Sequence, residues 1–593
     1  MKDIKMDLLN DSKNNEQYSI KHISLSEKES RQFTIEELYD LHKSYYTGEE
    51  IDQDYKQNIE LLKKAVDQGD SNAQFYLGIM YHEGQEVPQD SKQAVELYKK
   101  AAEQGNAKAQ FNLACMYYDG DGVPQDSKQA IELLKKAVDQ CDAKAQFFLA
   151  IMYYIGEEVP HDSKQALELL KKSLDQGNLD AQLPLGILYY NGEGTNKNYA
   201  RAAKLFKKVA DKGNPKAQFL LAIMYHNGYG VQKDYIQTEK WLQKSAAQGY
   251  ARAYFYLGIL YSAEEGFSHD YVRALEYFKK AADGDYIEAE FCLANMYFNG
   301  QGVKKDIALG IEWFKKSAEH GDVDSQFNLG VIYTQGIGVK KDQTEAFKWF
   351  KKAADNGNLD AEFNIALMYY DGDGVQKNHT KGLELFKKLA NQGMIIAQFR
   401  LAKMYYLGEG IHKDYKEAFK WLKMAADQGL SDAQYNLFFM YFNGEGVKRD
   451  FAEGLKYLKK SSDQGNSDAQ CNLGVLYLNG EGVKKDYSEA LKYFKKAADQ
   501  DNLDAQYNLG ILYLDGIGKE IPQDLKKALM WLKKAAIQGY LDAELVLGDI
   551  YFNEDYGIQD YKQAAKWYKR GAELGNVDAQ RNLRIIYKML AKS

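Results

Sequence analysis

The sequence is poor in the residues that break or cross-link a fold: 6 of its 593 residues are proline and 4 are cysteine. So few prolines favour long stretches of helix, and four cysteines cannot form a disulfide framework in a chain of this length. No apolar run reaches about 18 residues, which excludes a transmembrane segment. The opening residues, MKDIKMDLLNDSKNNEQ, lack the apolar core of a secretory signal.

An excess of positive charge is also missing. Lys and Arg number 77 against 85 Asp and Glu, so the formal net charge is −8. A mildly acidic chain has little attraction for a phosphate backbone, and we therefore expect no nucleic-acid partner. Hydrophobic residues make up 45% of the sequence, which is enough for a folded core. The composition favours a mainly helical protein of a reducing compartment, and we expect it to be cytoplasmic.

The most informative feature is an internal repeat. An Ala-Gln pair, or a close variant, recurs from Ala73 to position 505 in steps of 36 residues. The next step, to Ala543, is 38 residues because the segment 516–524 is two residues longer, and a last step of 36 reaches Ala579. Counting back from Ala73 places the first unit at Glu37. A period of this length predicts stacked modules instead of separate globular domains.

Each unit carries the pattern of two helices. With Ala73 as position 1, apolar or small residues fall at positions 1, 5, 8 and 9, which share one helical face. Glycine at position 12 ends this first helix. Asp at position 18, with Gln or Glu at position 21, forms the N-cap and capping box of a second helix, which glycine at position 33 closes. The repeat therefore predicts a helical hairpin in every unit.

Two positions predict how the hairpins stack. Position 9 is Tyr in all sixteen units, and position 6 is Gly or Ala almost throughout. A small residue allows two helices to approach closely, and the aromatic ring fills the space beside it. Phe438 occupies position 6 in one unit, and we expect it to overfill that contact and bend the array near 433–441.

The combined pattern, A-Q-F-x-L-G-x-M-Y-x-x-G-x-G-V-x-x-D-x-x-x-A-x-x-W-x-K-K-A-A-x-x-G, resembles the Sel-one-like repeat, a relative of the tetratricopeptide repeat with a longer loop between its helices. The resemblance covers about residues 37–593. It implies an all-α fold, a right-handed superhelical α/α solenoid of helical hairpins. Members of this family serve as adaptors in endoplasmic-reticulum protein degradation, as regulators of cell-wall synthesis, and as bacterial factors in signalling or host contact. The resemblance thus implies protein binding and leaves the partner open.

Departures from the repeat predict the organisation of the chain. Residues 1–36 are polar and are expected to form a flexible leader. Residues 37–578 are expected to form fifteen hairpins in one solenoid. In the segment 579–593, Arg581 and Arg584 replace an aromatic and a small residue, so this segment is expected to be a capping helix.

Catalytic chemistry has no support in the sequence. The histidines and cysteines are scattered over different repeat positions, and no HExxH, CxxC or nucleophile-elbow motif is present. The GxG segments lie between two helices in most units, so they are expected to be turns and not phosphate loops. All six tryptophans occupy position 25, which favours packing, and the Lys pair at positions 27 and 28 favours a solvated face. We expect no catalytic residue, cofactor or metal.

One group of residues is a candidate binding site. In tetratricopeptide-like arrays the first helix of each unit lines the concave side, and position 4 is often Asn here. In the unit that begins at position 397, positions 4 and 7 are Arg400 and Lys403, and the neighbouring units carry Asn364 and Asn436. Two cations flanked by two amides are suited to an acidic side chain or a peptide C-terminus. The alternative is an ordinary charged, solvated face.

The sequence therefore predicts a noncatalytic scaffold or adaptor that binds protein or peptide segments along the concave groove by many modest contacts. One alternative is a secreted or host-directed bacterial interaction factor of the same repeat type, which would be translocated into a host cell. A further alternative is a β-lactam-binding or β-lactam-hydrolysing enzyme, since some cysteine-rich repeat proteins of this kind are associated with that activity. Such an enzyme needs a nucleophile and a base that break the repeat together, and none is present.

Overall fold

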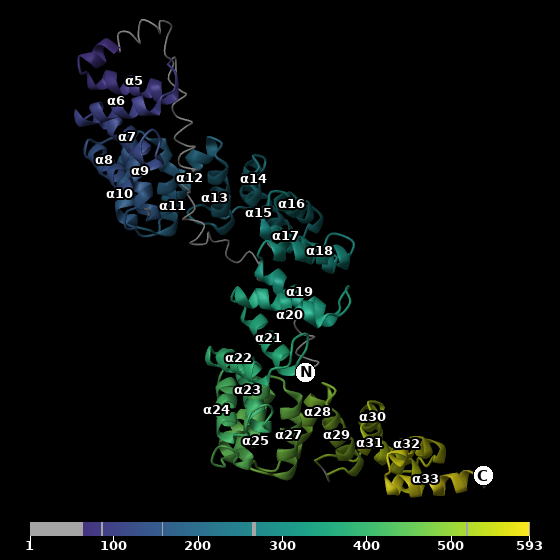
Figure 1. Ribbon diagram of the computed structural model, residues 1–593. Helices are drawn as coiled ribbons and strands as arrows, with labels where there is room; N and C mark the ends of the chain where they lie inside the picture. Colours follow the sequence, from purple (N-terminus) through teal and green to yellow (C-terminus); the bar gives the residue numbers. More distant parts are fainter. Residues whose placement is uncertain (1–62, 85–86, 157, 264–268, 518–519, 592–593) are drawn as a thin grey trace. The chain divides into compact units, whose positions relative to one another are not determined.

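The computed structural model describes residues 63–84, 87–156, 158–263, 269–517 and 520–591 (Figure 1). Within these residues helices follow one another in pairs, and the one strand-like contact is an isolated bridge between Ile517 and Ile521. The predicted all-α solenoid of helical hairpins is confirmed. The predicted leader, 1–36, and most of the first predicted hairpin lie outside the described residues.

The helices fall into two alternating sets. The first helices of the hairpins are α5 (Ser71–Glu83), α7 (Ala107–Asp119), α9 (Ala143–Ile155), α11 (Gln182–Asn191), α13 (Pro215–Asn227), α15 (Ala251–Ser262), α17 (Ile287–Asn299), α19 (Val323–Gln335), α21 (Leu359–Asp371), α23 (Ile395–Leu407), α25 (Ser431–Asn443), α27 (Ser467–Asn479), α29 (Leu503–Asp515), α31 (Leu541–Phe552) and α33 (Val577–Leu590). The second helices are α6 (Ser91–Glu103), α8 (Ser127–Asp139), α10 (Ser163–Asp175), α12 (Tyr199–Asp211), α14 (Tyr235–Ala246), α16 (Tyr271–Asp283), α18 (Ile307–Glu319), α20 (Gln343–Asp355), α22 (His379–Asn391), α24 (Tyr415–Asp427), α26 (Phe451–Asp463), α28 (Tyr487–Ala498), α30 (Leu525–Ile537) and α32 (Tyr561–Glu573). Two short 3₁₀ turns, η3 (Leu179–Ala181) and η4 (Glu554–Tyr556), precede α11 and follow α31.

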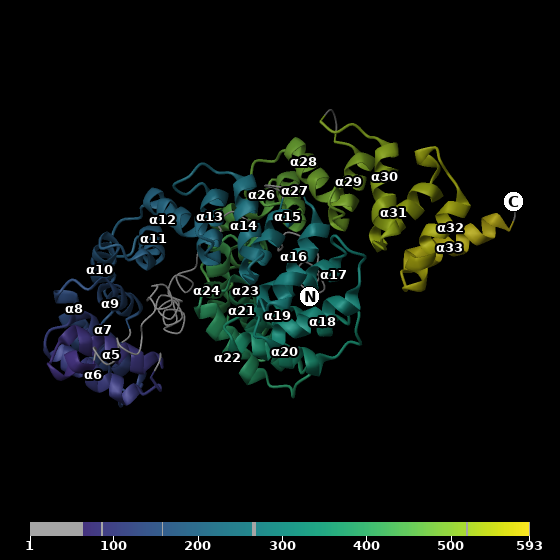
Figure 2. The same ribbon diagram turned by 90° about the horizontal axis from the view of Figure 1, so that it is seen from above.

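The chain divides into two compact units, residues 1–325 and 326–593. Their described parts are called here the N-terminal unit and the C-terminal unit. In each unit a helix contacts the helix that follows it, so consecutive hairpins lie side by side in chain order (Figure 2). No hairpin buries its apolar faces alone, and the buried clusters therefore extend across hairpin boundaries, as in the clusters over residues 149–297 and 363–457.

The helix ends follow the predicted capping rules. At the start of α6, the side chain of Asp90 accepts hydrogen bonds from the backbone N–H groups of Lys92 and Gln93. At the end of α5, Gly84 adopts a left-handed conformation with φ of 70° and donates its N–H to the carbonyl of Met80. This conformation strains any residue with a Cβ, which explains the glycine at position 12.

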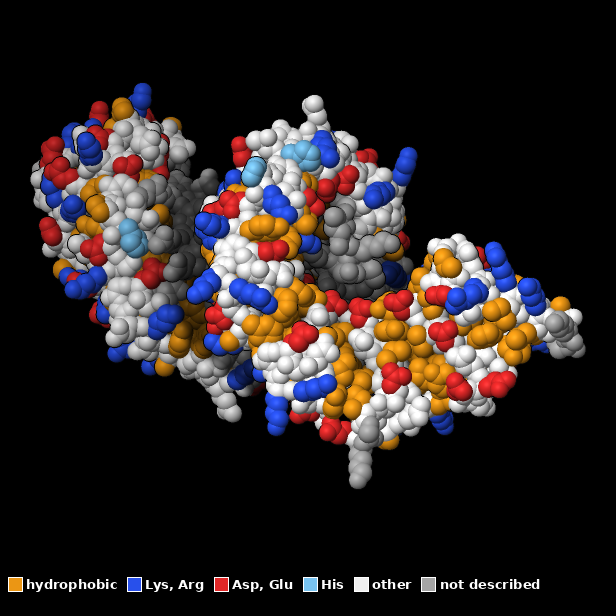
Figure 3. All heavy atoms as spheres, turned by 90° about the horizontal axis from the view of Figure 1, so that it is seen from below, with side chains coloured by type: hydrophobic (Ala, Val, Ile, Leu, Met, Phe, Trp, Pro, Cys, Tyr) orange, Lys and Arg blue, Asp and Glu red, His pale blue; other side chains and the backbone are white. Residues whose placement is uncertain are grey.

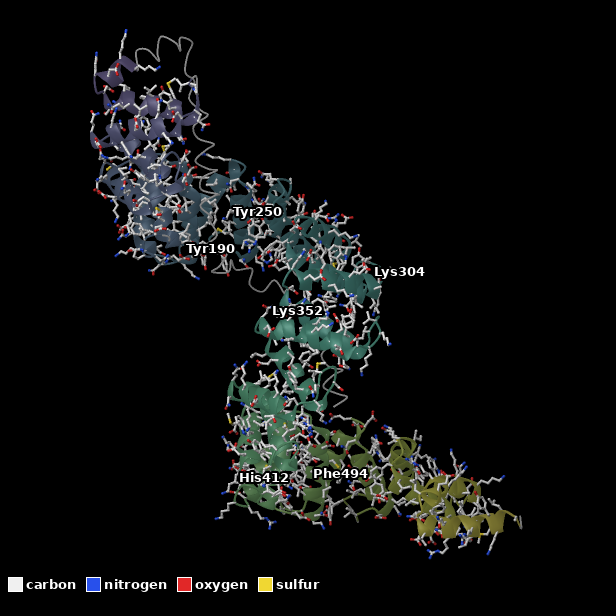
Figure 4. All side chains as sticks on the ribbon, in the orientation of Figure 1. Tyr190, Tyr250, Lys304, Lys352, His412 and Phe494 are labelled. Atoms are coloured by element: carbon white, nitrogen blue, oxygen red, sulfur yellow. The ribbon has the colours of Figure 1, made fainter. Side chains whose placement is uncertain are left out.

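A size rule links positions 6 and 26, which face each other within a hairpin. Where position 6 is glycine, position 26 is usually aromatic: a Cβ added to Gly474 would lie 2.7 Å from the ring of Phe494, labelled in Figure 4. The same pairing joins Gly78 to Tyr98, Gly186 to Phe206, Gly258 to Phe278, Gly330 to Phe350 and Gly548 to Tyr568, whereas Gly510 faces Leu532. Where position 6 is alanine, position 26 is leucine in Ala114–Leu134, Ala150–Leu170, Ala222–Leu242 and Ala402–Leu422.

Position 22 completes this rule. Ala366 faces an aromatic Phe386, and the extra volume is offset by Gly382 at position 22, whose added Cβ would lie 2.9 Å from the carbonyl oxygen of Ala366. The same compensation accommodates Phe438, because its hairpin has Gly454 at position 22 and only Leu458 at position 26. Phe438 is 4% exposed. The overfilling expected from the sequence is thus relieved within the hairpin, and the bend stays a prediction.

A buried glutamine at position 2 ties three helices together. Gln110, on α7, donates to the carbonyl of Ala102 on α6 at 3.1 Å and accepts from Gln140, at the end of α8, at 2.8 Å. The carbonyl of Ala102 belongs to the last turn of its helix, where backbone acceptors lack intrahelical partners. The same pair of bonds recurs at Gln218, Gln398, Gln434, Gln470 and Gln506. The repeat shows that glutamine recurs at position 2, but its hydrogen-bonding role is evident only from the contacts in the structure.

Candidate functional site

The first helices present a repeated apolar face. Side chains at positions 3, 7 and 10 share one side of each first helix because their spacing matches the helical turn. We call this side the first-helix face. In the C-terminal unit it is mainly apolar and half-buried, and it includes Leu367, Phe399, Tyr435, Phe439, Phe442, Val475, Leu478, Tyr507 and Ile511. Half-buried apolar side chains on successive helices form a surface suited to a peptide, with no concentration of reactive groups.

Acidic residues border this face at the N-terminal end of its helices. The second residue of a first helix is an exposed aspartate at Asp360, Asp432, Asp468, Asp504 and Asp542. Asp468 accepts a hydrogen bond from Asn502 of the next hairpin at 2.8 Å, and Asp504 accepts one from the hydroxyl of Tyr540 at 2.7 Å. Among the described residues these five carboxylates form no ion pair, so their charge stays available.

The opposite border, at the C-terminal ends of the same helices, carries both signs of charge: the guanidinium of Arg449 lies 5.4 Å from the ring centroid of Phe442, and the Nζ of Lys413 lies 5.9 Å from that of Tyr406. It carries Asp371 and Asp515 on α21 and α29, and Glu445 and Glu481 in the loops that follow α25 and α27. Glu445 accepts a hydrogen bond from the hydroxyl of Tyr406 at 2.9 Å. Figure 3 shows hydrophobic patches with acidic side chains beside them over the C-terminal helices, at the right of the view.

The electrostatics of aromatic and thiol groups on this face reflect these carboxylates. Burial, followed by the charge of Asp468, raises the pKa of Tyr435 to about 12. Burial, followed by the charge of Asp504, raises the pKa of the Cys471 thiol to about 12. Burial and the hydrogen bond to Glu445 raise the pKa of Tyr406 to about 12. In each case a negative neighbour disfavours a second negative charge.

Helix α23 differs from the other first helices of the C-terminal unit in where its charged and apolar side chains lie. Ile396 replaces the aspartate at the start of this helix and Leu407 lies at its end, and they are 40% and 53% exposed, while Glu409 in the following loop matches Glu445 and Glu481. Cations lie between them: the guanidinium of Arg400 is 5.3 Å from the ring centroid of Tyr370 and 3.9 Å from a carboxylate oxygen of Glu409. The side chain of Lys403 is exposed, with its Nζ 5.8 Å from the ring centroid of Phe399.

The four predicted binding residues lie on three consecutive first helices. Arg400 and Lys403 are one turn apart on α23, and Asn364 and Asn436 lie on α21 and α25. Asn364 donates to the backbone carbonyl of Asp360 at 2.8 Å, and Asn436 donates to that of Asp432 at 2.7 Å. Each amide therefore uses one of its two N–H donors on its own helix, and within the described residues no hydrogen bond joins the four side chains.

The tryptophan positions agree with a packing role. Trp241, Trp349, Trp421 and Trp531 are 4–7% exposed, and each belongs to a second helix. The Nζ of Lys352, at position 28, lies 4.2 Å from the ring centroid of Trp349, so one member of this Lys pair stacks on the tryptophan of its own helix. Figure 4 labels Lys352 near the start of the C-terminal unit.

The remaining reactive groups are dispersed. The four cysteines are free, and burial raises the pKa of Cys115 and Cys292 well above the usual thiol range. In the part of the chain that the structure covers, no three His, Cys, Asp or Glu side chains gather in a metal-binding arrangement. None of the described helices is long and apolar enough to cross a membrane.

Comparison with known proteins completes this picture. The sequence model of the Sel1 repeat matches fifteen consecutive segments, from residues 43–70 to residues 541–576. The chain belongs to the Sel1 repeat family. Its repeats share 32% identity with a protective antigen of uropathogenic Escherichia coli strains that displays an SLR fold, a solved structure with a TM-score of 0.53. That match covers 76% of this chain and 96% of the antigen.

A second solved structure is a Sel1 repeat protein from Oxalobacter formigenes, 34% identical, with 52% of this chain and 89% of that chain covered and a TM-score of 0.45. No protein with a curated description matches the chain. The Sel1 repeat solenoid is a fold typically used for protein–protein interaction.

Proposed function

We propose that this Sel1 repeat protein is a noncatalytic scaffold that holds segments of partner proteins along its first-helix faces. The observation that carries the proposal is the recurrence of half-buried apolar side chains on successive first helices, bordered by carboxylates that form no ion pairs among the described residues. A long surface of this kind binds by many modest contacts, and several bound segments raise one another's effective concentration.

Helix α23 is the proposed anchor within this surface. Arg400 and Lys403, with the second N–H of the side-chain amides of Asn364 and Asn436 on the adjacent helices, would bind an acidic side chain or a C-terminal carboxylate. The partial exposure of Arg400 and its 3.9 Å distance from Glu409 support a site in which an incoming carboxylate competes with Glu409. The double variant Arg400→Glu, Lys403→Glu is expected to weaken partner capture at unchanged helicity, and unaltered capture contradicts the anchor.

Affinity capture combined with crosslinking and mass spectrometry tests the scaffold proposal. The full-length chain is used as bait, and crosslinked sites are assigned to first or second helices. We expect crosslinks from partner proteins to concentrate on residues of the first helices, for example Lys403. Crosslinks confined to the lysine pairs of the second helices, such as Lys351 and Lys352, contradict the proposed surface.

A host-directed role is the second candidate. The similarity to the protective antigen of uropathogenic E. coli favours it, and it keeps the scaffold mechanism while changing the location. Fractionation of the producing cells and of contacted host cells separates the two cases. Recovery of the protein in the host fraction supports a translocated factor, and recovery only inside the producing cell supports the expected cytoplasmic adaptor.

A further inference from the structure

The acidic border of the C-terminal unit is not a requirement of the fold. An aspartate near a helix N-terminus interacts favourably with the helix dipole, a contribution of about 0.3–1 kcal/mol. The second residue of the first helix is nevertheless basic on four helices of the N-terminal unit, at Lys108, Lys144, Lys216 and Arg252. The same hairpin therefore forms with either charge at this position, and the helix dipole alone does not explain why aspartate recurs on the first helices of the C-terminal unit.

In the C-terminal unit the second residue of the first helices is nearly always aspartate. Every first helix from α21 to α33 has aspartate as its second residue, except α23, which has Ile396. Asp432, Asp468 and Asp504 each accept one hydrogen bond from the following hairpin, which fixes their position and leaves further acceptor sites on each carboxylate. The result is one oriented negative charge per hairpin along this border.

The two borders enclose the apolar face. A first helix of 13 residues is about 20 Å long, so a segment that lies along the row of first helices meets apolar side chains in the middle and a row of aspartates along the border at the helix N-termini. Such a surface repels an acidic segment and complements a segment whose apolar residues are interspersed with lysine and arginine.

We infer that the C-terminal unit docks a partner segment that is both basic and apolar, held by the row Asp432, Asp468 and Asp504 and by the apolar side chains of the first-helix face beside it. This inference rests on the proposed scaffold function and names the class of its partner. Because α23 has Ile396 in place of the aspartate and a cationic centre, a single acidic group in an otherwise basic segment fits there and sets the register of the segment.

Peptide binding to the full-length chain tests the inference. The first probe is a fluorescent synthetic peptide in which lysine and arginine alternate with leucine, phenylalanine and serine, and the second has glutamate at every basic position. The triple variant Asp432→Asn, Asp468→Asn, Asp504→Asn keeps the hydrogen-bond acceptors and removes three charges. We expect it to weaken binding of the basic peptide about tenfold, from three contacts of about 0.5 kcal/mol each.

A matched control removes the same number of charges elsewhere. Glu345→Gln, Glu453→Gln and Glu489→Gln lie on second helices, where each carboxylate pairs with a lysine three residues on. This control is expected to change binding of the basic peptide less than twofold. The inference is overturned if the acidic peptide binds as tightly as the basic one, if the basic peptide does not bind, or if the triple variant and the control have equal effects.

The outcomes separate this inference from the scaffold function. If captured partners crosslink to the first-helix borders of the C-terminal unit through acidic segments, the scaffold function stands and the basic partner is wrong. If partners crosslink only to second helices, the scaffold surface itself is wrong, whatever the peptides do.

Discussion

The N-terminal and C-terminal units have the same core and different first-helix surfaces. Position 4 of the first helix is mainly apolar in the N-terminal unit, at Tyr76, Phe148, Pro184, Leu220 and Tyr256, and mainly amide in the C-terminal unit, at Asn328, Asn364, Asn436, Asn472 and Asn508. The second residue of these helices is basic on four first helices of the N-terminal unit, whereas it is aspartate on every first helix from α21 to α33 except α23. Positions 6, 22 and 26 obey one size rule in both units, so the fold constrains these positions and leaves the others free to differ.

The largest expected effect comes from breaking what the two units share. Phe206 and Phe494 occupy position 26 in the N-terminal and C-terminal units, and both are fully buried. Phe206→Ala and Phe494→Ala are each expected to cost about 3–5 kcal/mol of unfolding free energy, because each leaves a cavity opposite a glycine. Chemical denaturation measures the loss of unfolding free energy in each variant. Losses that differ by more than about 2 kcal/mol contradict a common core rule.

The size rule itself predicts a rescue. Gly474→Ala places a Cβ 2.7 Å from the ring of Phe494 and is expected to cost about 1–3 kcal/mol. Adding Phe494→Leu recreates the alanine–leucine pairing of Ala402 and Leu422, so the double variant is expected to be more stable than the sum of the two single losses predicts. A double-mutant cycle that shows strict additivity contradicts the rule.

The main features of the hairpin can be predicted from local sequence. The pairing of positions 6, 22 and 26 cannot. The N-caps, the glycines that end the helices and the packing position of the tryptophans can each be recognised from residue spacing within a single helix. The accommodation of Phe438 depends on Gly454 and Leu458, which lie 16 and 20 residues further along the chain, and it requires knowing that these positions face one another.

The candidate site was predicted only in part. The sequence places Arg400 and Lys403 on one helix, and the structure agrees. The contacts of Arg400 with Tyr370 and Glu409 were not predicted, because they join a first helix to the preceding hairpin and to its own loop. The acidic second residues were also missed, although a comparison of that position between the two halves of the sequence would have revealed them.

Reversing the charge at the second residue of the first helices tests the difference between the two units. Its expected cost in unfolding free energy is smaller than that of the core variants. Asp432→Lys, Asp468→Lys and Asp504→Lys give the C-terminal unit the charge that four first helices of the N-terminal unit carry. Each change is expected to cost up to about 1 kcal/mol, from the helix dipole and one hydrogen bond to the next hairpin. Thermal unfolding with circular dichroism checks this, and loss of the folded state contradicts the view that this position is free to vary.

The smallest expected effect is a loss of folding stability at alkaline pH. The pKa of Tyr406 and of Tyr435 is raised to about 12 in the folded C-terminal unit. An unfolded chain ionises these phenols near pH 10, so their contribution to stability is constant below that pH and is lost as the pH rises from about 10 to about 12. Tyr406→Phe with Tyr435→Phe is expected to reduce this fall in denaturation series across that range. An unchanged pH dependence contradicts the assignment.

Protection of side chains in a bound complex tests the central claim most directly. Hydroxyl-radical footprinting of the full-length chain, with and without a captured partner, reports the exposure of aromatic residues on both helix sets. The account predicts protection of Phe399, Tyr435 and Tyr507 on the first helices and unchanged labelling of Trp349 and Trp421 on the second helices. Protection confined to the second helices, with the first-helix face still labelled at its free rate, would contradict it.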